Sequence, residues 1–333
     1  MQKIHLGILF GGRSAEHEIS ILSAKNILAA LDTTKFEPIL IGIDTHGGWH
    51  AVVSPDELAK IEPGKGAIDT KLLENCEVVF PVLHGPYGED GTIQGLFEMA
   101  GIPYVGCGVL ASALGMDKDL MKTVLCQAEI AVAPSMTLHK SDEPNYEEVV
   151  RKLGLPLFVK PANMGSSVGV NKVSQIEDLK AALEDAFRYD RKVLVETAIV
   201  GDEIECAVLG NEKPEASAIG RSIPQAEYYS YDAKYHDGGT TLLEIPAKIP
   251  EANAKKAQKL ALEVYKVLGC EGMARVDMFL KAEGNIVVNE INTIPGFTNI
   301  SMYPQLWGVS GLHYTDLITR LIELALERFK NKT

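Results

Sequence analysis

Short apolar runs alternate with helical patterns through the first third of the chain. Three of these runs are rich in strand-forming residues: Ile4–Phe10, Pro38–Ile43 and Val78–Leu83. Helical spacing follows at 14–31, where Ser14 is the expected N-cap, and at 93–100, which Gly101 closes. Strands that alternate with helices form a parallel sheet with helices on its faces. We therefore expect an N-terminal α/β domain over residues 1–116.

Near the C-terminus, two apolar runs flank a polar break and predict a β-hairpin. The runs are 274–280 and 285–292, and the break contains Gly. Because side chains alternate along strands, Asp277 falls opposite Glu290, with Cβ atoms about 5 Å apart. Two carboxylates that close repel unless one is protonated or a cation lies between them. With the amide of Asn292 they form an all-oxygen set that suits Mg²⁺, although an ordinary solvated hairpin face is an alternative interpretation.

The composition indicates a multidomain protein with no general affinity for polyanions. The chain has 333 residues, long for one domain, of which 46% are apolar and 23% charged. We expect a central subdomain over 117–211 and a C-terminal subdomain over 212–333. The net charge of −13 argues against binding to nucleic acid or to an anionic membrane. It does not exclude an anionic small ligand, because salt screening leaves local charges in control of a pocket.

The cysteines and the lack of a long apolar segment predict a cytoplasmic protein. The five cysteines are scattered, odd in number and without a CxxC pair, which favours free thiols in a reducing compartment. The first apolar run ends at Gly11-Gly12, too early for a signal peptide or a membrane span. No later stretch reaches the roughly 18 apolar residues that a membrane helix needs.

A glycine- and serine-rich loop, 161–169, follows the apolar strand that ends at Lys160. Its backbone N–H groups and hydroxyls can approach phosphate oxygens, and Lys160 adds a positive charge. No Gly-Lys-[Ser/Thr] follows, so this is not a Walker A loop, and a tight hairpin of small residues is the alternative. A second strand ends at Glu196, with Glu203 close behind it. This strand end could hold an adenine edge and a ribose, although surface acids are common.

Two polar loops are expected at the carboxyl edge of the N-terminal sheet, where ligands of such sheets bind. The first, 11–18, is a glycine turn that leads into a helix, and Glu16 within it could pair with a substrate ammonium group. The loop lacks GxGxxG spacing, which disfavours a dinucleotide site, and a plain helix start is the alternative. The second, 84–91, begins with His84, and a lone histidine is more often structural.

A polar segment at 227–239 contains four tyrosines and ends in Gly-Gly. It cannot form a core of its own, yet its rings disfavour free solvent. A lid that packs over a ligand is consistent with both properties, as is an ordinary surface loop whose rings lie on the domain.

Taken in order, these motifs resemble the ATP-grasp ligases, and most closely the D-alanine–D-alanine ligase family. The resemblance runs from about Ile4 to about Leu324. The motifs that carry it are GGRSAEHEIS (11–20), HGPYGEDG (84–91), GMDK (115–118), VKPANMGSSVGV (159–170), YDAKY (231–235), ARVD (274–277), NEINTIPG (289–296) and Ser301-Met302. The implied fold combines α/β and α+β parts: an N-terminal parallel-sheet α/β domain followed by a two-subdomain ATP-grasp fold, with ATP between the subdomains.

The resemblance implies an enzyme that joins two D-alanines through an acyl phosphate and releases ADP and phosphate, for peptidoglycan precursors. D-Lactate or D-serine as the second substrate is an alternative, and the YDAKY motif favours an amine nucleophile over D-lactate. A non-catalytic ATP-binding regulator is a further alternative. It would be expected to lose the metal ligands or Arg275, which this chain retains. The family is usually dimeric, so a homodimer is expected.

The resemblance also assigns roles to individual residues. Two Mg²⁺ ions, or Mn²⁺ in their place, would be held by Asp277, Glu290 and Asn292. The nucleotide would be bound by Lys118, Lys160, Ser167, Glu196, Thr197, Ala198, Ile199, Glu203 and Asn289. The catalytic set would be Glu16 for the first ammonium group, Ser166 and Tyr235 as its hydrogen-bond partners, and Arg275 with the Gly296 N–H for the oxyanion. The substrate-binding set would be His84, Lys234, Ser301 and Met302.

Overall fold

The computed structural model describes residues 2–64, 66–224 and 241–332. Its N-terminal part is built on a four-stranded sheet in the order β3-β2-β1-β4. β1 (Ile4–Gly11) pairs in parallel with β2 (Phe36–Ile43) and with β4 (Val78–Val82), which confirms the predicted parallel sheet. β3 (Trp49–Val52), which the sequence analysis did not predict, adds an antiparallel edge strand to β2.

Two helices lie near the predicted positions, α1 (His17–Ala30) and α3 (Thr92–Ala100). The short α2 (Pro55–Leu58), which was not predicted, packs on β2 and β3. α4 (Val109–Met116), also not predicted, packs against the strand Ile286–Asn292 of the C-terminal part. Gly101 ends α3 with a φ of 66°, as expected for a glycine C-cap. The prediction of Ser14 as the cap of α1 is wrong, because α1 begins at His17 and Glu16 is its N-cap residue. The Ser14 hydroxyl instead donates to the carbonyl of His84 and accepts from the Glu16 N–H.

A second four-stranded sheet forms the central part of the chain, in the order β5-β8-β6-β7. Its strands are antiparallel: β5 (Ser135–His139), β6 (Leu157–Pro161), β7 (Asn171–Val173) and β8 (Lys192–Thr197). Leu157, Val159 and Val195 pack with α6 (Tyr146–Leu153) and α7 (Leu179–Ala186) in one apolar cluster. The loop 162–170 leaves this sheet between β6 and β7.

The C-terminal part contains a five-stranded sheet in the order β11-β10-β9-β12-β13. Its strands are β9 (Asp202–Leu209), β10 (Glu215–Pro224), β11 (Thr241–Glu244), β12 (Met273–Leu280) and β13 (Ile286–Asn292). α5 (Lys118–Gln127) and α9 (Glu251–Val267) share an apolar cluster with this sheet. β9 pairs with β10 and β12, although the boundary predicted at residue 211 placed it with the central subdomain. The domain limits as such stay a prediction.

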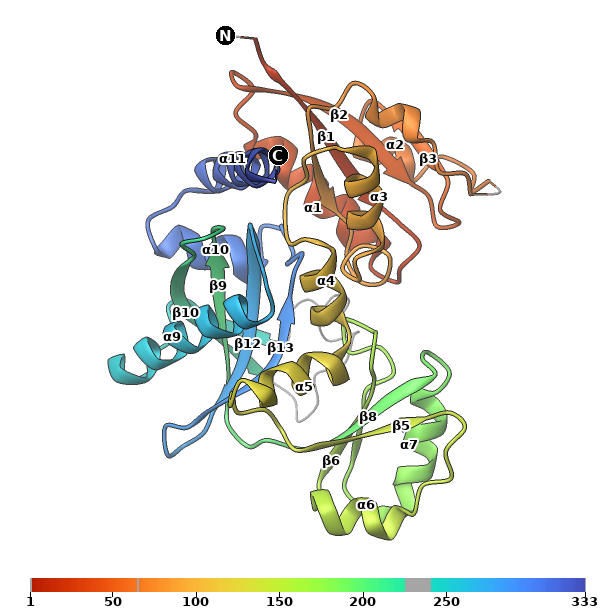
Figure 1. Cartoon of the computed structure of the whole chain (residues 1–333), viewed down its shortest axis with the longest axis vertical. Coiled ribbons are helices and arrows are strands. Elements are labelled where there is room, and N and C mark those ends of the chain that lie inside the picture. Colours follow the sequence, from red (N-terminus) through yellow and green to blue (C-terminus); the bar gives the residue numbers. More distant parts are fainter. Residues whose placement is uncertain (1, 65, 225–240, 333) are drawn as a thin grey trace.

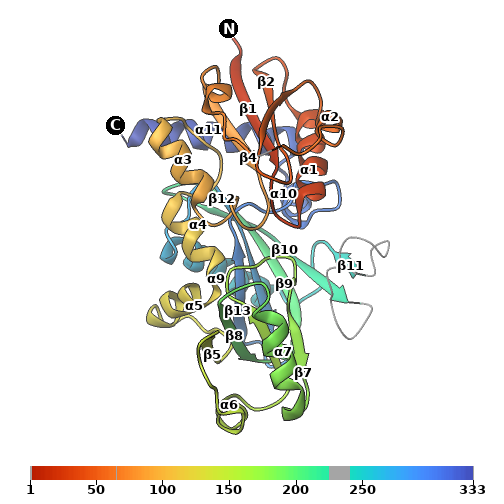
Figure 2. The ribbon, with the colours of Figure 1, turned by 90° about the vertical axis from the view of Figure 1, so that its right-hand side faces the viewer.

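The three sheets follow one another along the long axis of the molecule. Figure 1 and Figure 2 show the N-terminal sheet and the central sheet at opposite ends, with the five-stranded sheet between them. α10 (Met302–Val309) leads to α11 (Tyr314–Asn331), which returns to pack on α1 and β4. Among the described residues, no helix combines the length and the apolar character needed to cross a bilayer.

Candidate active site

The hairpin β12–β13 brings together the acids that were predicted to bind metal. Asp277 lies opposite Glu290, as predicted from the two apolar runs. Arg275 lies opposite Asn292, and a register shift follows between Asp277 and Met278. On the other side of β12, Asp277 lies opposite Glu205 of β9. Along β12 buried and half-buried residues alternate, so Arg275 and Asp277 share the half-buried face.

The electrostatics of this face fit a divalent cation. The Arg275 guanidinium donates to both carboxylate oxygens of Asp277 at 2.7 Å and lies 2.7 Å from Glu205. Burial, together with repulsion from Glu205 and Glu290, raises the pKa of Asp277 to about 7 despite Arg275. Arg275 alone does not balance the negative charge of Asp277, Glu205 and Glu290, and a metal ion would supply the missing positive charge. Within the described residues, no group of three or more His, Cys, Asp or Glu is placed to hold a metal. The Asn292 amide lies beside these acids and donates to Asp277 at 2.9 Å, and its role as a metal ligand stays a prediction.

A cavity of about 340 Å³ opens beside this hairpin. Its lining contains every residue predicted to bind the nucleotide: Lys118, Lys160, Ser167, Glu196, Thr197, Ala198, Ile199, Glu203 and Asn289. Ser166 and Glu290 line it as well, and Phe158, Val170 and Phe279 add apolar surface suited to a flat ring. A larger cavity of about 500 Å³, at 139–141 and 190–192, contains none of the predicted site residues.

Two lysines direct positive charge into the cavity. Lys118, at the start of α5, donates to the Met164 carbonyl at 2.7 Å and lies 3.7 Å from Glu290. Lys160, at the end of β6, pairs with Glu196 and lies 3.4 Å from the Asn289 side-chain oxygen. Burial disfavours the charged form of Lys160, but Glu196 outweighs it and raises the pKa of Lys160. Lys160 therefore stays charged, and both lysine side chains reach the cavity where phosphate oxygens would bind.

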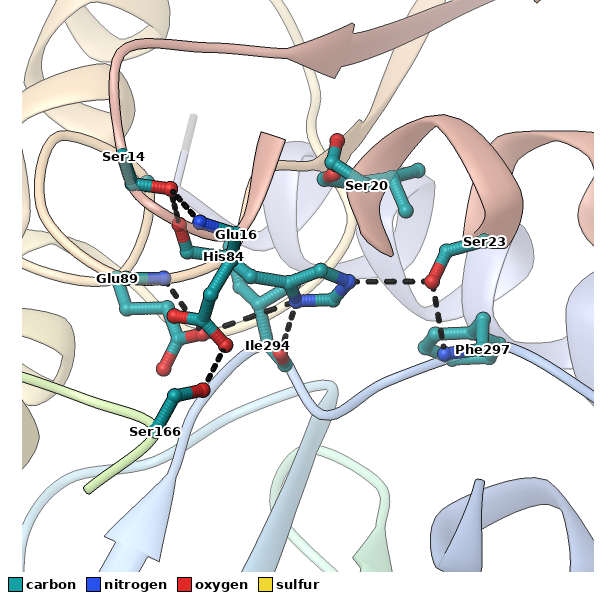
Figure 3. A network of polar contacts seen from close by, with 12 residues as sticks. Ser14, Glu16, Ser20, Ser23, His84, Glu89, Ser166, Ile294 and Phe297 are labelled. Atoms are coloured by element: carbon teal, nitrogen blue, oxygen red, sulfur yellow. Dashed lines mark hydrogen bonds and ion pairs between the residues drawn. The ribbon is translucent and has the colours of Figure 1, made fainter. Parts of the chain in front are cut away.

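The loop between β6 and β7 connects this cavity to the N-terminal domain. Ser166 and Ser167 have φ values of 50° and 60°, a conformation that non-glycine residues adopt rarely and that is concentrated at functional sites. The Ser166 hydroxyl donates to the Glu16 carboxylate, as Figure 3 shows. The structure thus brings together two residues, 150 positions apart, that were predicted to cooperate.

His84 lies in the same polar network, to which the Ser14 hydroxyl connects it (Figure 3). Its Nδ1 faces the Ile294 carbonyl at 3.1 Å, with Glu89 at 3.8 Å, and its Nε2 faces the Ser23 hydroxyl at 3.2 Å. Burial favours the neutral ring, but Glu89 and Glu16 outweigh it and raise the pKa of His84. Because both ring nitrogens have protein partners, the arrangement favours a structural role, and substrate contact by His84 stays a prediction.

The segment after β13 places the remaining predicted residues. A Cβ atom at Gly296 would lie 2.7 Å from the Ser301 hydroxyl oxygen, so a side chain there requires a shift. That hydroxyl accepts from the Thr298 N–H at 2.9 Å, which fixes Ser301 at the start of α10. Met302 is buried in the core that α10 and α11 form with the N-terminal sheet. Tyr235 and Lys234, with the proposed lid, lie outside the described residues.

Comparison with known proteins agrees with this arrangement. Residues 5–107 match the family described as D-ala D-ala ligase N-terminus, and residues 124–323 match D-ala D-ala ligase C-terminus. The chain belongs to the D-alanine–D-alanine ligase family. It is accordingly an ATP-dependent ligase, as the sequence analysis predicted.

Full-length relatives and solved structures support this membership. The D-alanine–D-alanine ligase of Shouchella clausii is 50% identical over 353 residues, which cover 98% of this chain and 96% of the relative. D-alanine–D-alanine ligase A of Escherichia coli K12 is 50% identical over 354 residues, with 98% and 97% covered. The ligase structure from Coxiella burnetii has a TM-score of 0.86 at 40% identity, covering 99% of this chain and 97% of the other. The VanG D-Ala:D-Ser ligase of Enterococcus faecalis has a TM-score of 0.87 at 38% identity, covering 97% and 100%.

Three residues that contact predicted site residues of this D-alanine–D-alanine ligase family member were not themselves predicted. Glu205 pairs with Arg275, Glu89 lies beside His84, and Lys122 pairs with Glu196. Glu89 lies within the quoted motif HGPYGEDG, and Lys122 is one helical turn after Lys118. The four-residue spacing indicates that Lys122 lies near Lys118 on the helix, but it does not indicate that Lys122 pairs with Glu196.

Glu196 gives this family member a measurable acid sensitivity. Burial opposes ionisation, but Lys160 and Lys122 outweigh it and lower the pKa of Glu196 from 4.5 to about 2. A lowered native pKa stabilises the fold above the unfolded pKa, and this stability is lost as the pH falls towards 2. Between pH 6 and pH 3 the wild type should lose about 2 kcal/mol of unfolding free energy that Glu196→Gln does not lose. Urea unfolding at both pH values measures the difference, and equal losses in the two proteins would contradict it.

Proposed function

We propose that this chain joins two D-alanines to D-alanyl-D-alanine at the expense of ATP, for the synthesis of peptidoglycan precursors. One observation carries the proposal: the cavity that unites the predicted nucleotide residues also reaches Ser166, which bonds to Glu16 of the N-terminal domain. A carboxylate at Glu16 suits the ammonium group of an amino acid. ATP and the first amino acid would therefore meet at the loop 162–170.

In the first step, a carboxylate oxygen of the first D-alanine attacks the γ-phosphorus, the bond to ADP breaks, and an acyl phosphate forms. Such transfer depends on positioning and charge neutralisation. Lys118 and Lys160 would hold the phosphates, while Glu16 orients the attacking amino acid. Two Mg²⁺ ions at Asp277, Glu290 and Asn292, with Mn²⁺ as a possible substitute, would supply further neutralisation of phosphate charge.

In the second step, the amine of a second D-alanine attacks the acyl carbon, loses a proton and expels phosphate. The tetrahedral intermediate carries an oxyanion, for which the Arg275 guanidinium and the Gly296 N–H are the proposed donors. Burial opposes the charged form of Arg275, but the neighbouring carboxylates of Asp277 and Glu205 outweigh it and raise its pKa well above the ordinary value, so Arg275 acts as a fixed donor and never as a base. Ser301 and Lys234 would hold the carboxylate of the second D-alanine.

Water must be excluded while the acyl phosphate exists. The segment 228–239 is our proposed lid, with Tyr235 as a further partner of Glu16 and Ser166.

Ser166→Ala removes the hydroxyl donor that joins the loop to Glu16. We expect kcat to fall about tenfold, because a hydrogen bond to a charged group contributes roughly 1.5 kcal/mol or more. Steady-state kinetics measure the change in kcat, and Ser174→Ala, at an exposed position, is the control. An unchanged kcat for Ser166→Ala would show that its bond to Glu16 does not contribute to turnover.

Phosphate release from ATP tests the assignment with D-alanine, L-alanine, D-serine or D-lactate added singly and in pairs. We expect phosphate release to rise when D-alanine is added and not when any of the other three compounds is added without it. The likeness to the VanG D-Ala:D-Ser ligase favours D-serine as the second candidate for the second substrate position. Greater stimulation by D-alanine with D-serine than by D-alanine alone would support that alternative. Stimulation by none of these compounds would refute both.

We also propose that the protein is a homodimer. The family resemblance supports this, and exposed apolar side chains on α3 and α4 are candidate interface residues. Met99, Leu110 and Val109 are 92%, 68% and 40% exposed. Light scattering at micromolar concentration measures the mass directly. Replacement of Met99 and Leu110 by Glu should shift a dimer towards monomer if this face is the interface.

A further inference from the structure

A buried carboxylate lies between two lysines at the back of the nucleotide cavity. Glu196 is 3% exposed. One carboxylate oxygen, Oε1, pairs with Lys160, and the other, Oε2, accepts from Lys122 at 2.5 Å. Lys122 is 4% exposed and also donates to the Ala133 carbonyl at 3.2 Å. Each carboxylate oxygen therefore has its own cation.

The two lysines differ in their access to the cavity. Lys160, Glu196 and Lys118 line it, whereas Lys122 does not. Lys118 and Lys122 lie one turn apart on α5, so one helix places Lys118 at the cavity and Lys122 behind Glu196. Lys122 is thus held entirely by protein groups and has no direct path to a ligand in this cavity.

This arrangement bears on the transfer of Lys160 from Glu196 to a phosphate. A buried carboxylate that loses its only cation is strongly destabilised. With Lys122 on Oε2, Glu196 keeps a partner when Lys160 turns towards the nucleotide. The three groups also carry one net positive charge, whereas Lys160 and Glu196 alone would carry none. Both effects favour an anionic ligand in the cavity.

We propose that Lys122 is a positioning residue for the nucleotide: it holds Glu196 from behind and thereby releases Lys160 to bind phosphate. The inference rests on the proposed role of Lys160 but not on the identity of the amino-acid substrates. The low pKa of Glu196, which both lysines cause, agrees with a carboxylate that stays ionised throughout.

ADP binding with Mg²⁺, measured by isothermal titration calorimetry on the full chain, tests the inference without turnover. Lys122→Met removes the charge and keeps the length of the side chain. We expect ADP to bind at least about tenfold more weakly, because Lys160 is then tied to a carboxylate with no other cation. Lys192→Met is the matched control. Lys192 pairs with Asp117 and Asp119 of the same α5 region but does not line the nucleotide cavity, so ADP affinity should stay within about threefold.

A second substitution separates positioning from general damage. Lys122→Met with Glu196→Gln restores one net positive charge to the group, so the double variant should bind ADP more tightly than Lys122→Met alone. General damage to the fold would not be repaired in this way. Where Lys122→Met does not fold, the double variant is compared with Glu196→Gln, and removal of Lys122 should then change ADP affinity less than about threefold.

The outcomes are distinct. Equal ADP affinity of the wild type and Lys122→Met overturns the inference, as does a double variant that binds no better than Lys122→Met. A tenfold or larger effect of removing Lys122 in the Glu196→Gln background also overturns it, because Lys122 would then act independently of Glu196. A wild type that binds ADP but ligates no D-alanine refutes the proposed function and leaves this test intact.

Discussion

Glu290→Gln is expected to lower the rate of D-alanine-dependent phosphate release about 10³-fold or more. Glu290 lies opposite Asp277 across the hairpin, lines the nucleotide cavity and lies 3.7 Å from Lys118. A neutral amide at this position would hold the proposed Mg²⁺ ions more weakly than a carboxylate, because Mg²⁺ prefers charged oxygen ligands. Metal ions contribute several kcal/mol of charge stabilisation in such transfers, and about 4 kcal/mol corresponds to 10³ in rate.

The same hairpin supplies the control for this variant. Glu283 lies in the turn between β12 and β13, is exposed, and pairs only with neighbours in the turn among the described contacts. Glu283→Gln makes the identical chemical change without touching the cavity, so its rate should match the wild type. An active Glu290→Gln would remove the metal site from the account. Steady-state rates at saturating Mg²⁺ compare the three proteins.

Arg275→Lys is expected to lower kcat by about 10²- to 10³-fold while ADP affinity changes only a few-fold. Arg275 donates to Asp277 from two nitrogens and also lies 2.7 Å from Glu205. A lysine keeps the charge but loses this forked geometry and one aimed donor to the oxyanion. Loss of one such donor typically reduces kcat by this amount.

The same substitution at an arginine outside the site serves as the control for Arg275→Lys. Arg221 lies on β10, which β9 separates from β12; it pairs with Asp202 and Glu244 and does not line the cavity. Arg221→Lys should keep kcat within about twofold, since surface pairs contribute little. If Arg275→Lys loses ADP binding in proportion to kcat, Arg275 acts on the nucleotide and not on the oxyanion.

Local periodicity predicted those parts of the fold whose hydrophobic pattern is strong. The hairpin is the clearest case, because alternation fixes which side chains share a face. The exact pairing of Asp277 with Glu290 also depends on a register shift between Asp277 and Met278, which the apolar pattern did not indicate. The parallel strands β1, β2 and β4 were found for the same reason. β3 was missed because Trp49–Val52 is short and mixes His with apolar residues. The cap of α1 was misplaced because the Ser14 hydroxyl bonds to His84, a partner 70 residues away.

Local periodicity did not predict most residues of the site. Residues predicted for the nucleotide came mainly from the family resemblance, and the structure shows that they line one cavity. Composition and spacing alone could not pair Ser166 with Glu16 or Glu196 with Lys122, since these contacts depend on how whole domains pack. Glu205 shows the same limit: only the pairing of β9 with β12 brings it to Arg275.

The central claim is that the γ-phosphoryl group passes to a D-alanine carboxylate before the peptide bond forms. D-Alanine labelled with ¹⁸O in its carboxyl group tests this directly, with mass spectrometry of the phosphate released from ATP. The account predicts one ¹⁸O atom in each phosphate formed together with dipeptide, because the bridging oxygen leaves with the phosphoryl group. Dipeptide formed with unlabelled phosphate would contradict it.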